Sequence, residues 1–238
     1  MKIALLYCHV VTPNLDAKMK ISDYRAASER FVTTYQKFKP AAAHELHIAC
    51  AGGATDAYTK NLFPNAVFHP YLDHGKDCGM FREIGRRLPV DWVIGLSSHV
   101  HFTRNGWFER LMAGPLYLGV GLFGPMGSYE HSPHLRTSCI VFKPEDMAAY
   151  PFQITKPQHA RAFESQEWNY TRWMQDRREP VLMVTWGGFW AQKDWRKPDA
   201  IFRRGDQSNT IISDKNTDIY NEADARTKEA LAKAADGY

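Results

Sequence analysis

The segment Lys2-Ile3-Ala4-Leu5-Leu6-Tyr7 opens the chain with a short apolar run. A run of this length is typical of a strand that is buried on both faces of a parallel sheet. From Ser22 to Phe38 the apolar side chains then recur at helical spacing, with Ser22 in the position of an N-cap. A buried strand followed by a helix predicts the first half of a βαβ unit and therefore an α/β fold.

The same alternation continues along the chain. Further strands are expected at Leu46–Cys50, Ala66–His69, Trp92–Leu96, Leu116–Phe123, Thr137–Phe142 and Val181–Thr185. Further helices are expected at Asp77–Leu88, Gly106–Met112, Glu167–Arg177 and Asn221–Ala235, with another starting after Lys143. The pattern predicts a Rossmann-like α/β domain over residues 1–220, whose mixed, mostly parallel central sheet is flanked by helices. Residues 221–238 are expected to form a helical C-terminal tail.

Composition narrows the class of protein. Of the 238 residues, 44% are hydrophobic and 24% are charged, which is ordinary for a soluble globular protein. No apolar stretch approaches the roughly 20 residues of a membrane helix, and no export signal precedes the first strand. The four cysteines (Cys8, Cys50, Cys78 and Cys139) lack metal-type spacing. We therefore expect reduced, mostly buried thiols in a cytoplasmic protein.

The charge balance suits a small anionic ligand. A formal net charge of +4 is compatible with a phosphate-bearing ligand. It is too weak to argue for a membrane surface or for nucleic acid as a partner, and it does not exclude nucleic acid.

Three polar segments follow expected strands. They are Tyr7–His9, Leu72–Asp77 and Ser97–His101. Ligands of open α/β sheets collect beyond the carboxyl ends of the strands, so these segments are candidate binding sites. Gly75 and Asp77, at a helix start, would place backbone N–H groups and a carboxylate beside a sugar or ribose hydroxyl. The alternative is that Asp77 only complements the helix dipole.

His99 and His101 form a candidate metal site. They are two positions apart, so on an extended chain both would point to one face. Two imidazoles there would bind a divalent metal, which would in turn clamp a diphosphate leaving group. Metals that serve phosphates prefer oxygen ligands, so hydrogen bonding to substrate or ordinary packing is the alternative.

The segments around residues 134 and 164 carry further candidates. His134 and Arg136 precede an expected buried strand and suit an anionic or polyhydroxyl ligand, although an ion pair would explain Arg136 equally well. Glu164 and Glu167 each offer a general base that would deprotonate an acceptor hydroxyl. A Glu in the first turn of a helix is also commonplace.

The last candidate segment is Arg203–Asn209. It is a dense polar turn that contains Arg204 and Asp206. It suits neutralisation of a diphosphate, or plain loop structure.

Taken in order, these segments resemble bacterial and viral GT-A glycosyltransferases, including the branch related to rhamnan and capsular polysaccharide synthesis. Asp73–Phe81 resembles "N-x-G-x-D-x-G-x-F" with His74 in place of Asn, and Leu96–Val100 is similar to an "LNSS" or "LDDDV" strand end. The other matching segments are Gly106–Leu111 ("GWLxxL"), Pro133–Thr137 ("H-[IL]-[QR]-[ST]"), Phe163–Ser165 ("FE-S/G") and Phe202–Tyr220 ("FR-x-G-x-Q-x-N…D-x-x-T-x-x-Y"). Their order and spacing carry the resemblance, which spans most of residues 1–220.

The resemblance implies a GT-A-like fold and a hexosyltransferase-like enzyme of polysaccharide biosynthesis. Such an enzyme moves a sugar from a nucleotide-sugar donor to a glycan or other hydroxyl acceptor. Glu164, or failing that Glu167, would be the base of an inverting displacement. The implied donor contacts are Cys8, His9, Gly75, Asp77, Ser97, Ser98, Arg203 and Arg204. The implied acceptor or substrate contacts are His134, Arg136 and Asp206.

One departure from the family pattern concerns the metal. GT-A enzymes usually carry an Asp-x-Asp motif that holds Mg²⁺ or Mn²⁺ against the donor diphosphate, and this chain has Ser97-Ser98-His99 there. Either His99 or His101 replaces the carboxylates, or Arg203 and Arg204 neutralise the leaving group without metal, or donor binding is lost. Two alternatives to the transferase function therefore stay open. One is a non-catalytic nucleotide- or glycan-binding module, and the other is a phage-type transferase that modifies DNA.

Overall fold

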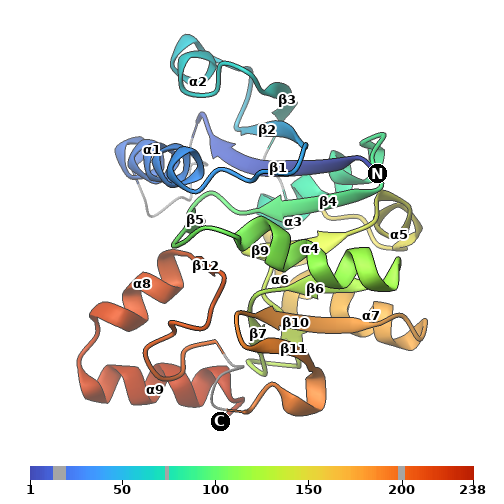
Figure 1. Cartoon of the computed structure of the whole chain (residues 1–238), viewed down its shortest axis with the longest axis vertical. Coiled ribbons are helices and arrows are strands. Elements are labelled where there is room, and N and C mark those ends of the chain that lie inside the picture. Colours follow the sequence, from blue (N-terminus) through green and yellow to red (C-terminus); the bar gives the residue numbers. More distant parts are fainter. Residues whose placement is uncertain (13–19, 73–74, 198–201) are drawn as a thin grey trace.

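A computed structural model describes residues 1–12, 20–72, 75–197 and 202–238 (Figure 1). The strands are β1 (Ile3–Val10), β2 (Glu45–Ala51), β3 (Val67–Tyr71), β4 (Trp92–Leu96), β5 (His101–Phe102), β6 (Leu122–Gly124), β7 (Gly127–Ser128), β8 (His134–Leu135), β9 (Cys139–Phe142), β10 (Val181–Thr185), β11 (Gly188–Ala191) and β12 (Ile212–Ser213). The α-helices are α1 (Ile21–Lys37), α2 (Ala57–Leu62), α3 (Lys76–Glu83), α4 (Trp107–Leu118), α5 (Pro144–Ala149), α6 (Pro157–Ser165), α7 (Tyr170–Asp176), α8 (Lys215–Glu222) and α9 (Ala225–Ala235).

The central sheet has eight strands in the order β11-β10-β6-β9-β4-β1-β2-β3. The strand β1 pairs in parallel with β2 and β4, and β2 with β3, while β9 runs antiparallel between β4 and β6. At the other end β10 is parallel to β6 and antiparallel to the edge strand β11. The mixed, mostly parallel α/β sheet expected from the sequence is therefore confirmed.

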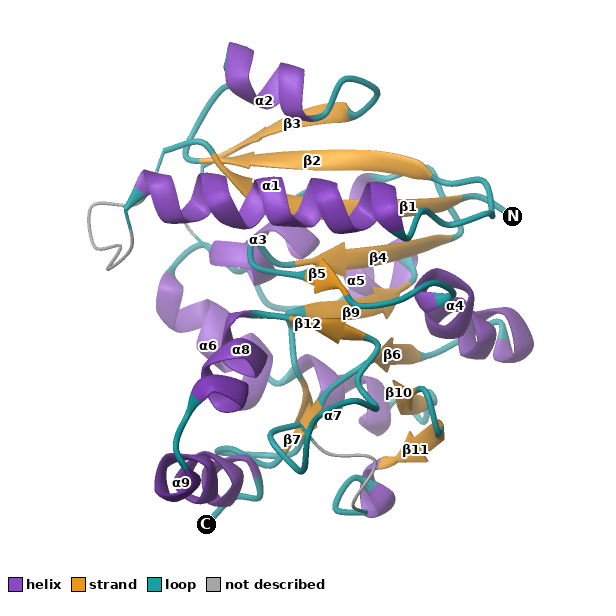
Figure 2. Cartoon of the chain, turned by 60° about the vertical axis from the view of Figure 1, so that its left-hand side comes forward, coloured by secondary structure: helices purple, strands orange, loops and turns teal. Residues whose placement is uncertain are grey.

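Helices cover both faces of the sheet, as Figure 2 shows, with α1 and α4 in front and α3, α5, α6 and α7 behind. Alternate side chains of β1 face opposite layers because successive residues of a strand point to opposite faces. Leu5 and Tyr7 belong to the apolar cluster with α1 and α4, whereas Leu6 and Cys8 belong to the cluster with α3, α5, α6 and α7. Burial on both faces explains the uninterrupted apolar run.

The first strand and helix differ from expectation at their ends. The strand β1 continues to Val10, so Cys8 and His9 lie within it and do not follow it. The N-cap of α1 is Lys20, not Ser22, because the carboxylate of Asp23 accepts a hydrogen bond from the Lys20 backbone N–H at 2.9 Å.

The expected strand at Leu116–Phe123 was wrong over most of its length. The helix α4 continues through Pro115 to Leu118, and β6 begins only at Leu122. Leu111, Met112 and Pro115 are buried at helical spacing, so packing keeps this segment helical despite the proline. The helix ends at Gly119, whose left-handed backbone (φ 72°) suits a helix C-terminus.

The C-terminal segment packs on the rest of the chain. The helix expected over Asn221–Ala235 covers only the end of α8 and all of α9. A new helix begins there because Asp224 caps α9 by accepting a hydrogen bond from the Thr227 N–H at 2.7 Å. The Ala235 carbonyl accepts a hydrogen bond from the Tyr129 N–H at 2.7 Å, and the Ala235 side chain is buried. The sequence also missed α2 and α6.

Two expectations from composition can be compared with the structure. All four cysteines are buried, as expected. Within the described ranges, no helix combines the length and the apolar character that crossing a bilayer requires.

The histidines make the stability of the fold dependent on pH. Burial lowers the pKa of His9 to about 4, and burial also lowers the pKa values of His69, His99 and His134. The unfolded chain therefore binds more protons than the native state below about pH 6.5. We expect the free energy of unfolding to fall as pH decreases from about 6.5 towards 4, with His9 alone contributing on the order of 2 kcal/mol at about pH 5.

Urea denaturation at several pH values between about 5 and 7 checks this prediction. Replacing His9 by Gln should make the pH dependence shallower. A free energy of unfolding that stays constant over this range would contradict the assignment.

Candidate functional site

A cavity of about 200 Å³ lies where several candidate segments meet. Its lining residues are Asp77 at the start of α3, Ser97, Ser98 and His99 after β4, Arg136, Thr137 and Ser138 before β9, Glu164 in α6, and Asp214, Lys215 and Asn216 around the start of α8. The cavity thus brings together six of the residues singled out in the sequence. Its lining is mainly hydroxyl, carboxylate and cationic side chains, which suits a polyhydroxyl or phosphorylated ligand.

Glu164 is held by the loop that precedes β9. Its Oε1 accepts hydrogen bonds from the Thr137 N–H at 3.3 Å and from the Thr137 hydroxyl at 3.0 Å. The Arg136 Nε lies 3.7 Å from the same oxygen, and 23% of the Glu164 side chain is exposed. Burial would raise the pKa of Glu164, but Arg136, His134 and the two bonds from Thr137 together lower it. Glu164 is therefore a carboxylate at neutral pH.

The segment after β4 forms a tight turn. The Val100 N–H donates to the Ser97 carbonyl at 3.3 Å, and the Tyr7 hydroxyl donates to the Ser98 carbonyl at 2.8 Å. The Ser97 N–H in turn donates to the Ser138 carbonyl at 2.9 Å. These bonds hold the turn against β1 and against the segment before β9.

This turn corrects the expected histidine pair. His99 lies in the turn and lines the cavity, while His101 lies in β5, so the two are not neighbours on one extended strand. The His101 Nε2 lies 3.9 Å from Asp218 Oδ1, outside the cavity lining. Burial lowers the pKa of both imidazoles, and Lys215 lowers that of His99 further.

The residues that follow β4 do not supply the paired carboxylates of an Asp-x-Asp motif. At the end of β4 they offer two hydroxyls and one imidazole, whereas Mg²⁺ and Mn²⁺ prefer carboxylate oxygens. Over residues 1–12, 20–72, 75–197 and 202–238, no group of three or more His, Cys, Asp or Glu side chains is placed to hold a metal ion.

The donor contacts expected at the first strand face the interior. His9 is 1% exposed, its Nδ1 is hydrogen-bonded to Ser28 at 2.8 Å and its Nε2 to Thr59 at 3.0 Å. The Thr59 hydroxyl donates to Asp56, so it accepts from His9 Nε2. Cys8 is likewise buried. Neither side chain lines the cavity.

Gly75 and Asp77 lie at the start of α3. A Cβ on Gly75 would lie 2.4 Å from the Ile154 carbonyl oxygen and 2.8 Å from Gly79 Cα, so close backbone packing explains the glycine. Asp77 is in the first turn of α3 and also lines the cavity. Asp73 and His74 of this segment lie outside the described residues.

The residues of the Arg203–Asn209 turn make separate contacts. Arg204 binds the C-terminal segment, with its NH2 2.7 Å from Asp236 Oδ2. Asp206 is exposed, and its Oδ1 accepts a local hydrogen bond from the Ser208 N–H at 2.9 Å. Arg203 reaches Asn216, a cavity residue, with 3.4 Å between its NH2 and Asn216 Oδ1.

His134 and Glu167 both lie outside the cavity lining. His134 is fully buried, and its Nδ1 donates to the Ser132 carbonyl at 2.7 Å. Glu167 is exposed and precedes α7, because Asn169 caps that helix by accepting a hydrogen bond from the Arg172 N–H at 3.1 Å. The expectation that a helix begins at Glu167 was therefore wrong.

Sequence reasoning missed the part of the site that comes from the start of α8. Asp214 caps α8, since its Oδ1 accepts hydrogen bonds from the Thr217 N–H at 2.8 Å and from the Thr217 hydroxyl at 3.0 Å. The Ser138 hydroxyl donates to the other carboxylate oxygen, Oδ2. The spacing of Asp214 and Thr217 is a recognisable helix-start signal, but nothing in the sequence connects it to Ser138.

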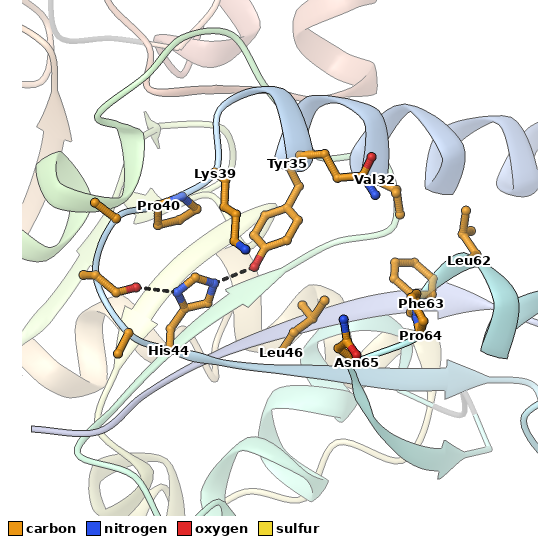
Figure 3. A pocket seen from close by; sticks show the side chains of 14 residues that line it. Val32, Tyr35, Lys39, Pro40, His44, Leu46, Leu62, Phe63, Pro64 and Asn65 are labelled. Carbon is orange, nitrogen blue, oxygen red and sulfur yellow. Dashed lines mark hydrogen bonds between the residues drawn. The ribbon is translucent and has the colours of Figure 1, made fainter.

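A larger cavity of about 450 Å³ lies at the opposite ends of the strands (Figure 3). It is bounded by the second half of α1, by the loop that enters β2 and by the turn that enters β3. Its polar centre is Tyr35, which donates to His44 Nε2 at 2.6 Å, while His44 Nδ1 donates to the Ala42 carbonyl at 2.8 Å. None of the candidate residues from the sequence lines this cavity.

Comparisons with known proteins identify the fold. No protein-family profile and no curated protein sequence matches this chain. Mouse xyloside xylosyltransferase 1 in its apo form is structurally similar, with a TM-score of 0.54 and 9% identity over 92% of this chain and 99% of that chain. TarS from S. aureus has a TM-score of 0.49 and 11% identity over 98% of this chain and 42% of that chain, and nothing is inferred from it. At such low identity the likeness shows the fold alone, which is GT-A-like.

The packing of Gly75 yields a prediction about stability. Replacing Gly75 by Ala should lower the free energy of unfolding by about 1–3 kcal/mol, because the new methyl group has backbone atoms in its way. Chemical denaturation measures the change. Gly188→Ala is a matched control, since its Cβ would meet Trp190 at an ordinary 3.4 Å. Equal effects of the two substitutions would contradict the packing role.

Proposed function

We propose that the chain is a glycosyltransferase that moves a sugar from a nucleotide-sugar donor to a hydroxyl acceptor at the 200 Å³ cavity. The observation that carries the proposal is the convergence of Asp77, the turn after β4, Arg136 and Glu164 on one cavity. Its position at the carboxyl end of β4 is where open α/β sheets bind ligands. The GT-A-like fold supports the same reading.

Within this proposal Glu164 is the general base. In an inverting displacement the acceptor oxygen attacks the anomeric carbon, and the bond from that carbon to the donor phosphate oxygen breaks. The acceptor proton passes to Glu164, and the leaving diphosphate keeps the electron pair of the broken bond. Since Arg136 and Thr137 keep Glu164 ionised, the acid limb of the rate profile should lie below the ordinary glutamate pKa of 4.5.

The Ser97-Ser98-His99 turn favours one alternative, a nucleotide- or glycan-binding module without turnover. It lacks the carboxylates of an Asp-x-Asp motif. The two functions share a ligand and differ in whether the donor is cleaved.

A donor panel separates the two functions. The chain is incubated with UDP-, GDP-, dTDP- and CMP-sugars and a set of glycan acceptors, and release of the nucleotide is measured. A transferase releases the nucleotide from one donor class with an acceptor-dependent rate. Thermal stabilisation by a donor without its cleavage would favour the binding module, and neither effect with any donor would contradict both.

The role of Glu164 gives a matched pair of variants. Glu164→Gln keeps the shape and the acceptor for the Thr137 bonds but removes the base, so donor cleavage should fall by at least about a hundredfold with donor affinity retained. Glu167→Gln should change the rate by less than about twofold, because Glu167 is exposed and outside the cavity. The reverse pattern would make Glu167 the base, and unchanged turnover in Glu164→Gln would remove the assignment.

A further inference from the structure

Three cationic side chains from separate segments gather beside the cavity. Arg136 and Lys215 line it, and Arg203 reaches the cavity residue Asn216. The two guanidinium groups share the ring of Phe202, with Arg136 Cζ 5.0 Å and Arg203 Cζ 4.7 Å from its centroid. Burial lowers the pKa of Arg203, and the charge of Arg136 lowers it further. Glu130 and Asp214 raise the pKa of Arg203, but they do not cancel the effects of burial and of Arg136.

Both guanidinium groups also have unused donors. Over the described ranges, the buried Nε atoms of Arg136 and Arg203 have no hydrogen-bond partner. Arg136 NH1 lies 3.8 Å from Glu130 Oε2, and Arg136 Nε lies 3.7 Å from Glu164 Oε1. Both distances are longer than a charge-assisted hydrogen bond. Buried donors of this kind normally have a partner, so the arrangement suits an incoming acceptor such as a phosphate oxygen.

Two of the carboxylates that line the cavity, Glu164 and Asp214, accept hydrogen bonds from the protein itself. Oε1 of Glu164 accepts two hydrogen bonds from Thr137, and Asp214 accepts from Thr217 and Ser138. Both oxygens of Asp214 and Oε1 of Glu164 are thus bound within the protein. The cations come from the loop before β9, the Phe202–Arg203 segment and the start of α8.

We propose that Arg136, Arg203 and Lys215 bind the phosphates of the donor and stabilise the leaving diphosphate without a divalent cation. This inference rests on the proposed function for the identity of the ligand. Arg136 and Arg203 present planar sets of N–H donors that match phosphate oxygens, and Lys215 adds a point charge. The negative charge that develops on the leaving oxygen is then met by side-chain cations fixed in the fold.

Calorimetric titration with inorganic pyrophosphate in the presence of EDTA tests the proposal. The wild-type chain should bind pyrophosphate without metal, and Arg136→Gln, Arg203→Gln and Lys215→Gln should each weaken binding about tenfold or more. Arg172→Gln is the matched control, because Arg172 is 77% exposed and pairs only loosely with Asp176 at 3.9 Å. Binding that appears only with Mn²⁺, or variants that bind like the control, would overturn the proposal.

Further variants, and a comparison with donor cleavage, separate a failure of this inference from a failure of the proposed function. Arg136→Lys retains the charge and should recover only part of the lost affinity, and the exposed Lys215 carries the test if Arg136→Gln does not fold. Metal-free binding of pyrophosphate without cleavage of any sugar donor would uphold the metal-free phosphate site and contradict the proposed function. Donor cleavage that EDTA abolishes would uphold the function and contradict the inference.

Discussion

The candidate site depends on a short pairing between segments that are far apart in the chain. The strand β12 pairs with β5, with Ile212 opposite Phe102 and Ser213 opposite His101. Ile212 and Phe102 are both buried, and Phe102 stacks on Trp107 with 3.7 Å between ring centroids. This apolar contact anchors the chain immediately before Asp214. Asp214 then accepts a hydrogen bond from the Ser138 hydroxyl, and this bond connects the start of α8 to the segment before β9.

The lining of the site therefore has two main parts that are held in different ways. The first part comes from the turn after β4, the start of α3 and the segment before β9, next to the central sheet. The second part comes from the start of α8, which is held by the β12–β5 pairing, by the Asp214 cap and by side-chain contacts such as Arg30 NH1 to Asp218 Oδ2 at 2.6 Å. Figure 1 shows α8 and α9 beside the sheet, at its β5 side and below. The second part adds Asp214 and Lys215 to the Arg136 of the first part and the Glu164 of α6.

The sequence predicted most of the strands that are buried on both faces, and for two of them it also predicted the bounds. Trp92–Leu96 and Val181–Thr185 have the predicted bounds, because a buried strand between turn residues leaves little ambiguity. Asp77, Ser98 and Glu164 meet because the relevant element ends lie at one edge of the sheet. The extension of α4 through Pro115 was not predictable, since tertiary packing there overrides local propensity.

The contribution of α8 to the site was not predicted, for a different reason. A pairing of two-residue strands leaves no periodic pattern in the sequence, so neither Lys215 nor Asn216 could be placed at the end of β4. The interior role of His9 depends on Ser28 and Thr59, which come from α1 and α2, and the second of these helices was not predicted. From its residue type alone, His9 was therefore expected to contact the ligand, whereas in the fold it is buried and hydrogen-bonded to Ser28 and Thr59.

The central claim is that the 200 Å³ cavity binds the phosphates of a nucleotide-sugar. The most direct measurement is a crystal structure of the chain soaked with the nucleoside diphosphate that stabilises it most. The account predicts phosphate oxygens within hydrogen-bond distance of Arg136 and Lys215, beside the turn at Ser98. A nucleotide in the larger cavity beneath α1, near Tyr35 and His44, or phosphates without a contact to either cation, would contradict it.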